Sequence, residues 1–215
     1  MSRTADGAQT QTPAINPVFP LLLLETMRDM DRPTEVLEGE NLAASLPRRL
    51  GLSDVVYLQI HKLREETKRR RPQTAEVVAD LVRLVIRRPD AEEIFEEAGR
   101  RLARHAWKEK SPVARGWLKL LPAGVRMGAA VRAARRTLRQ VAGHGRLEVR
   151  GRPFRVRVVR SLTASADPGG AACTFYNGLI AEVLTLHTGR AHAVRHEACE
   201  ARRGDACEWS AAVIA

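Results

Sequence analysis

The spacing of apolar residues changes at Gly143, and this change sets the kind of fold that the chain can adopt. Upstream, apolar residues recur at three- and four-residue steps, which is the spacing of one buried helix face. Downstream, Leu147 and Val149 and then the segment 154–158 alternate apolar with charged residues, which indicates strands. We therefore expect an α+β fold in which helices from the first part pack on a small antiparallel sheet from the second.

The first part of the chain is expected to be mainly helical over residues 16–142, after a disordered polar tail at residues 1–15. One helix face is predicted from Val77, Leu81, Leu84 and Val85, and another from Ile94, Phe95, Ala98, Leu102 and Ala106. The predicted helices cover residues 21–30, 37–50 (short or broken), 55–63, about 75–87, a long stretch from 91, and 125–141.

The second part, residues 143–215, is expected to form one compact domain together with 16–142. A hairpin with an arginine-rich face comes first, and a helix at 175–187 then ends before Gly189, a typical left-handed stop. Two final strands, 192–198 and 207–213, are joined by a turn at Gly204 and Asp205.

The number of cysteines and the lack of long apolar runs indicate the cellular compartment in which the protein is expected. No stretch approaches the roughly 20 consecutive apolar residues that span a bilayer. The first residues lack the basic-then-apolar order of a secretory signal. Three cysteines are an odd number, so a complete disulfide framework is excluded, whereas a reducing compartment leaves all three free to bind a metal. We expect a cytoplasmic protein.

Positive charge is concentrated between Arg100 and Arg139, where twelve Lys or Arg stand against Glu109 alone. This block accounts for the formal net charge of +11. It is compatible with a solvated helix face, and also with nucleic acid, an acidic membrane surface or an acidic partner. Nucleic-acid binding is disfavoured because no DNA-binding motif accompanies the charge and only nine aromatic residues exist for stacking.

All three cysteines fall in the last 43 residues, in the pattern C-x22-H-x2-C-x7-C. Cys173 precedes a predicted helix, while His196, Cys199 and Cys207 fall on the last predicted hairpin, whose turn can bring them around one point. Three sulfurs and one imidazole suit a closed tetrahedral zinc site. Spacing alone leaves a second interpretation open, in which the cysteines are small buried apolar residues and His196 is a surface or paired histidine.

The residues around this pattern resemble a known family. The segments 173–178 (Cys-Thr-Phe-Tyr-Asn-Gly), 196–199 (His-Glu-Ala-Cys) and 203–209 (Arg-Gly-Asp-Ala-Cys-Glu-Trp) are similar to the C-terminal part of the vinyl-4-reductase domain family. The resemblance covers residues 145–213. It implies a fold similar to the small-molecule-binding subunits related to the TRAPP vesicle-tethering proteins.

The resemblance also implies a structural zinc ion held by an upstream cysteine, an acidic residue and two later cysteines. Cys173, Cys199 and Cys207 match three of these positions, and His196 stands where the family usually has glutamate. Glu197 is adjacent, but alternation along a strand directs it to the other face. Because imidazole is a good zinc ligand, we expect the site to be kept.

A closed zinc site performs no chemistry, so function is expected in a pocket between the sheet and the helices. Trp107, Trp117, Phe154 and Tyr176 are the residues predicted to line it, with ordinary core packing as the alternative for each. No catalytic residue is predicted, since the chain has no G-x-G-x-x-G or phosphate loop and no spare acid–base set.

The function expected first is a binding or sensor domain for a hydrophobic or aromatic small molecule, forming a homodimer as the related folds tend to do and relaying binding to a protein partner. The resemblance keeps a second function open, an enzyme or accessory protein of tetrapyrrole and bacteriochlorophyll synthesis acting in vinyl reduction. A self-sufficient enzyme is not expected. Binding of nucleic acid or an acidic surface through the basic block is the third alternative.

Overall fold

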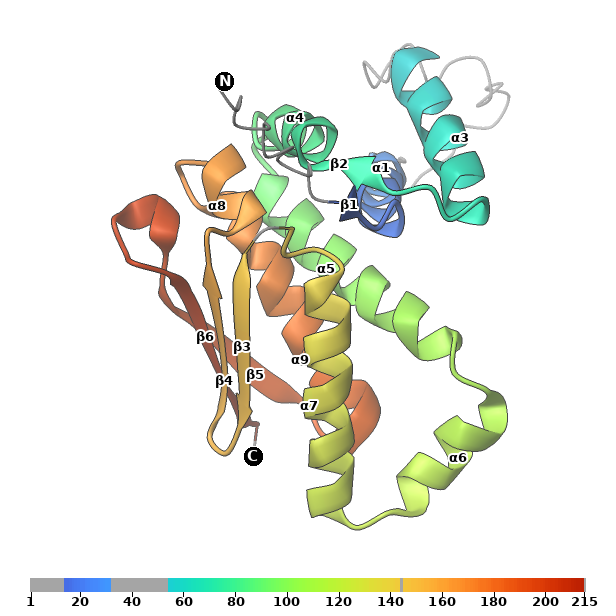
Figure 1. Cartoon of the computed structure of the whole chain (residues 1–215), viewed down its shortest axis with the longest axis vertical. Coiled ribbons are helices and arrows are strands. Elements are labelled where there is room, and N and C mark those ends of the chain that lie inside the picture. Colours follow the sequence, from blue (N-terminus) through green and yellow to red (C-terminus); the bar gives the residue numbers. More distant parts are fainter. Residues whose placement is uncertain (1–13, 32–53, 144, 215) are drawn as a thin grey trace, which may run out of the picture.

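The computed structural model describes residues 14–31, 54–143 and 145–214, and within them the chain forms a mixed α+β fold (Figure 1). The helix expected over residues 37–50 lies outside the described residues. The helices are α1 (Val18–Met30), α3 (Asp54–Lys68), α4 (Ala75–Val85), α5 (Ala91–Lys108), α6 (Pro112–Leu120), α7 (Ala123–Arg139), α8 (Leu162–Ala166) and α9 (Thr174–Thr188). The strands are β1 (Ala14–Ile15), β2 (Gln73–Thr74), β3 (Arg146–Gly151), β4 (Phe154–Val159), β5 (His192–Ala198) and β6 (Cys207–Val213).

The larger sheet has the strand order β3-β4-β6-β5, and every neighbouring pair is antiparallel. On β4, Phe154, Val156 and Val158 are buried, while Arg155 and Arg157 point to solvent. The predicted arginine-rich face of the hairpin is thereby confirmed. A second, two-residue pairing joins β1 to β2. The predicted disordered tail was expected to reach residue 15, and this end point is wrong, because Ile15 is fully buried in a strand.

Helix α9 lies at the centre of the fold because it contacts both α5 and the strands β5 and β6. Its crossing with α5 is close: a Cβ at Gly178 would stand 1.9 Å from the backbone oxygen of Glu96, and one at Gly99 would stand 2.1 Å from that of Phe175. Both positions therefore require glycine. Helix α7, from the predicted helical part, packs beside the sheet as expected, and the C-terminal α9 packs there as well (Figure 1).

The helix faces follow the predicted spacing in α5 and depart from it in α4. In α5 the predicted Ile94, Phe95, Ala98 and Leu102 are buried. In α4 the predicted Val77 and Leu84 are 38% and 44% exposed, and Val78 and Val82 are buried beside Leu81 and Val85 instead. Apolar residues lie on more than one side of α4, so the three- and four-residue spacing of a buried face fits two neighbouring faces of this helix.

Two short helices were not predicted. Helix α6 lies between the long helix predicted from residue 91 and the helix predicted at 125–141. Ser111 caps it by accepting a hydrogen bond from Ala114 N at 3.2 Å, and Pro112 occupies its first turn. Val113, Trp117 and Leu120 recur along it at helical spacing, but none of its residues is buried. Helix α8 has five residues, which is too short to show a period.

Candidate metal centre

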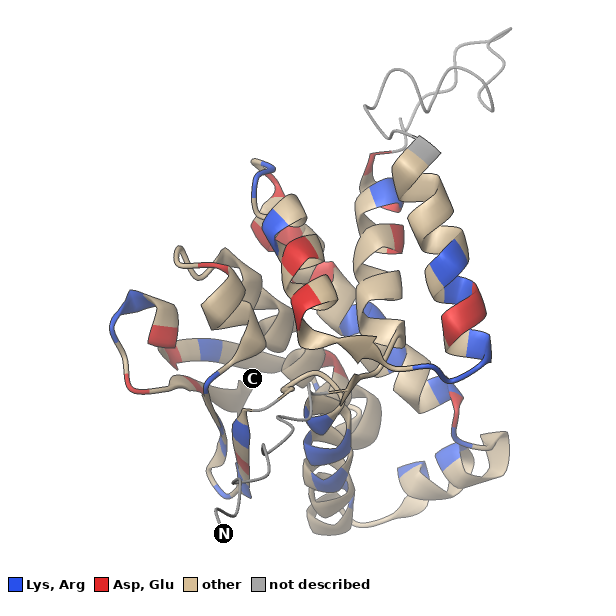
Figure 2. Cartoon of the chain, turned by 45° about the horizontal axis from the view of Figure 1, so that its top comes forward, with Lys and Arg blue, Asp and Glu red and all other residues tan. Residues whose placement is uncertain are grey.

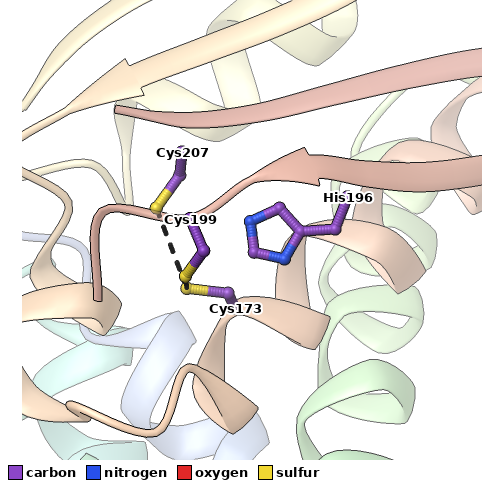
Figure 3. Close-up of side chains that lie close together, drawn as sticks. All are labelled: Cys173, His196, Cys199 and Cys207. Atoms are coloured by element: carbon purple, nitrogen blue, oxygen red, sulfur yellow. Dashed lines mark hydrogen bonds between the residues drawn. The ribbon is translucent and has the colours of Figure 1, made fainter. Parts of the chain in front are cut away.

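Four side chains from three parts of the chain meet at one end of the sheet (Figure 3). Cys173 closes a short 3-10 turn (Ala171–Cys173) directly before α9, His196 lies on β5, Cys199 follows β5, and Cys207 begins β6. One ligand atom from each residue lies within 4.8 Å of every other. The four residues predicted as metal ligands therefore form one Cys3His group at metal-binding distance.

The distances between the sulfurs fit a shared ion better than a disulfide. The Sγ atoms of Cys173 and Cys207 are 4.0 Å apart, as are those of Cys173 and Cys199. Two thiolates each about 2.3 Å from a tetrahedral ion lie about 3.8 Å apart, whereas a disulfide needs about 2.05 Å. All three cysteines are free and buried.

A β-bulge explains how His196 and Cys199 face the same point. Residues three apart on a regular strand point to opposite faces. Here His196 pairs with Trp209 while Ala198 pairs with Glu208, so β5 carries one extra residue, Glu197, at this place. Glu197 is exposed and accepts a hydrogen bond from Ser210 Oγ at 2.5 Å, which confirms that it faces away from the cysteines.

The imidazole of His196 is stacked on an aromatic ring, and one of its nitrogens has no hydrogen-bond partner among the described residues. Its ring stacks on Trp209 with the centroids 4.7 Å apart and the planes 7° apart, and Trp209 in turn packs on Tyr176. The Nε2 atom of His196 is buried and has no hydrogen-bond partner among the described residues. A buried polar atom with no partner is costly unless something binds it, so this nitrogen fits a metal ligand.

The thiols of Cys207 and Cys173 have pKa values shifted in opposite directions. The hydrogen bond with Cys173 lowers the pKa of the Cys207 thiol to about 5, and His196 and the backbone N–H of Glu200, 3.4 Å from Cys207 Sγ, act in the same direction. The same bond to Cys207, together with burial, raises the pKa of Cys173 in the absence of a cation. A bound cation would instead lower the pKa of this thiol, because a metal-coordinating thiol is deprotonated.

A second layer of hydrogen bonds fixes the segment that presents Cys173. Thr163 Oγ1 lies 3.5 Å from Cys173 Sγ, and Asp167 accepts the backbone N–H groups of Gly169 at 2.9 Å and Ala172 at 2.8 Å. Gly170 between them has φ +80°, and a Cβ there would stand 3.1 Å from Cys199 Sγ. Such outer partners orient metal ligands.

The hairpin tip is tied to the rest of the sheet by Glu200. Its carboxylate accepts the backbone N–H groups of Arg160 at 3.2 Å and Ser161 at 3.0 Å, just before α8. Its own N–H is the one that points at Cys207 Sγ. The loop that carries Cys199 is thereby held against the segment that follows β4.

Four protein donors around one buried point leave no open position, which is the arrangement of structural metal sites.

The four aromatic residues predicted to line a pocket are not brought together. Tyr176 is fully buried and Phe154 is 4% exposed, so both belong to the core, and Trp117 is 66% exposed on α6. Trp107 lines a cavity between α5, α7 and α9, whose lining does not include the other three residues. The burial of Phe154 and Tyr176 is that of core residues, which is the alternative considered for them from the sequence.

The cavity beside Trp107 has a volume of about 420 Å³ and lies between α5, α7 and α9. Sequence reasoning missed Lys110 and His187, whose Nζ and Nε2 atoms are 2.7 Å apart although 77 residues separate them in the chain. No local signal links them. The full lining is Ala103, Ala106, Trp107, Glu109, Lys110, Ala129, Arg132, Ala133, Arg136, Thr137, Gln140, Val183 and His187.

The basic block divides into two groups in the structure (Figure 2). On α5, Arg100, Arg101 and Arg104 form ion pairs with carboxylates of the chain, so their charge is compensated. The arginines of α7 form no ion pair with a described residue. Charge therefore stays uncompensated along α7, next to the cavity.

Comparisons with family models, with curated proteins and with solved structures found no match. The resemblance to the vinyl-4-reductase domain family and to the TRAPP-related fold accordingly stays a prediction. Within the described residues, no helix is long and apolar enough to cross a membrane.

Proposed function

We propose that this chain is a small-molecule-binding domain whose C-terminal hairpin is held by a structural zinc ion. Cys173, His196, Cys199 and Cys207 would hold the ion, and three sulfurs with one imidazole are a donor set that zinc accepts. When bound, zinc would join the start of α9 to the β5–β6 hairpin. It would contribute to folding and not to catalysis.

The observation that carries the binding function is the cavity between α5, α7 and α9. Its volume of about 420 Å³ falls in the range of small-molecule sites, which are typically about 300–1,000 Å³. Apolar and polar side chains line it together, as in sites that both bury and orient a ligand. The hydrophobic or aromatic ligand expected from the sequence would pack against Trp107 and the alanines of the facing helices.

Binding can be tested with N-phenyl-1-naphthylamine, an uncharged aromatic probe whose fluorescence rises in apolar sites. We expect saturable binding to the zinc-loaded protein. Trp107→Ala should weaken it about tenfold, because an aromatic wall of the cavity is lost. Trp117→Ala is the matched control, since Trp117 is an exposed tryptophan outside the cavity. Absence of saturable binding, or equal loss in both variants, would contradict the proposed function.

The remaining expectations stay predictions. A role in tetrapyrrole synthesis predicts turnover of a vinyl tetrapyrrole with a supplied reductant. Nucleic-acid or acidic-surface binding predicts an affinity that falls steeply with salt. The cytoplasmic location, the homodimer and the protein partner have no direct support, although Val113, Trp117 and Leu120 on α6 are 66–79% exposed and offer an apolar surface for association.

A further inference from the structure

Three cations gather at the cavity between α5, α7 and α9 without a carboxylate to compensate them. Lys110, Arg132 and Arg136 all line it, and none forms an ion pair with a described residue. Glu109 also lines the cavity, but its carboxylate is directed to His105 Nε2 at 3.8 Å. The cavity, which is partly open to solvent, therefore carries an excess of positive charge.

Lys110 is held in place by two groups that do not neutralise it. His187 Nδ1 lies 2.8 Å from the backbone oxygen of Val183, so Nδ1 carries the proton and Nε2 accepts a hydrogen bond from the Lys110 ammonium at 2.7 Å. The ammonium also stands 5.0 Å from the centre of the Trp107 ring. The imidazole and the indole fix the position of the charge and leave it available.

The three cations disfavour one another. Burial lowers the pKa of Lys110, and the nearby positive charges of Arg136 and then Arg132 lower it further. Such a cluster is unfavourable in the free protein, and an anion among the three side chains would remove the repulsion. Thr137, Gln140 and His187 supply further polar atoms to the lining of the cavity.

The lining of the cavity also includes small apolar side chains. These are Ala103 and Ala106 on α5, Ala129 and Ala133 on α7, and Val183 on α9. Four alanines on neighbouring helices leave the space that larger side chains would fill. The cavity thus combines apolar surface with three positively charged side chains.

We propose that this cavity binds an amphiphilic organic anion, in which a carboxylate, sulfonate or phosphate group is carried on an apolar or aromatic body. Lys110, Arg132 and Arg136 bind the acidic group, and the alanines of the lining and Trp107 bind the body. This inference rests on the proposed function, since it specifies the ligand of the same cavity.

A matched pair of probes separates the two claims. The aromatic sulfonate 8-anilinonaphthalene-1-sulfonate and the uncharged N-phenyl-1-naphthylamine share the same ring system and differ in the sulfonate. We expect the sulfonate to bind more tightly, with an affinity that falls as salt rises. The double variant Arg132→Gln/Arg136→Gln should weaken sulfonate binding about tenfold or more. Binding of the uncharged probe should be unchanged, which also shows that the variant is folded.

Arg139→Gln is the control, because it removes one positive charge from the same helix at a position that does not line the cavity. If both probes bind alike and neither responds to the double variant, the anion inference fails and the binding function stands. Equal weakening by Arg139→Gln would also overturn the inference, since general surface charge would then account for binding. If neither probe binds to the unaltered protein, the proposed function itself is wrong.

Discussion

His196 and His192 lie four residues apart on β5, and His196 alone faces the three sulfurs. Replacing His196 with Ala removes a zinc donor, so we expect zinc affinity to fall by more than about 100-fold, since loss of an outer partner alone costs roughly 10- to 100-fold. Competition with a chromophoric chelator measures this. His192→Gln removes a buried histidine of the same strand and should leave zinc affinity unchanged. Equal losses in both variants would exclude His196 as a ligand.

Apart from the cysteines, His187 is a residue whose pKa the fold shifts strongly. Burial lowers its pKa from 6.5 to about 4, with a further contribution from Lys110. The unfolded chain therefore binds this proton first as pH falls, so His187 contributes stability above pH 6.5 that is lost between 6.5 and about 4. The groups facing it are Trp107, Glu109, Lys110, Arg132 and Arg136.

The pH dependence is tested by thermal unfolding of the protein and of His187→Gln across that range. The midpoint of the unaltered protein should fall more steeply with acidification than that of the variant. The two proteins share every other titratable group, so the difference between the two curves isolates His187. Parallel curves would show that His187 is protonated as readily in the folded protein as in the unfolded chain.

At the scale of elements, the crossing of α5 and α9 positions both the metal ligands and the cavity. Gly178→Ala places a Cβ against the Glu96 backbone and should lower the free energy of unfolding by about 3 kcal/mol. Gly116→Ala is the control: no atom lies within 4 Å of the added Cβ on α6, so the variant should gain about 0.5–1 kcal/mol from better helix propensity. Urea unfolding measures both. Tolerance of alanine at Gly178 would contradict the close crossing.

The sequence predicted some elements to the residue and missed others, for physical reasons that differ. The final strands His192–Ala198 and Cys207–Val213 were predicted with their observed ends because alternation is a strong local signal. The four proposed metal ligands were predicted because their residue types are rare and clustered. The bulge at Glu197 left no local signal, since it depends on how β5 pairs with β6.

The cavity could not be predicted because its residues come from three helices that only tertiary packing brings together. Lys110 and His187 follow no motif. Trp107 was predicted for a pocket with Trp117, which is exposed, and with Phe154 and Tyr176, which are core residues. Aromatic residue type alone does not distinguish a ligand contact from core packing.

For the whole molecule, the proposed zinc ion would join the start of α9 to the β5–β6 hairpin, and the helical core would rest on its own packing. Removal of zinc by a chelator should therefore loosen the β5–β6 tip and the start of α9, while α1, α4 and α5 keep their buried contacts. Hydrogen exchange before and after chelation measures this. Loss of protection throughout the chain would instead mean that the fold as a whole depends on the ion.

The central claim is that Cys173, His196, Cys199 and Cys207 hold a closed zinc site. Zinc-edge X-ray absorption of the full chain as purified tests it most directly, because it reports the number and type of the bound atoms. The account predicts three sulfurs at about 2.3 Å and one nitrogen at about 2.0 Å. A protein that folds and is purified without zinc, or a zinc ion with water or carboxylate oxygen in its first shell, would contradict it.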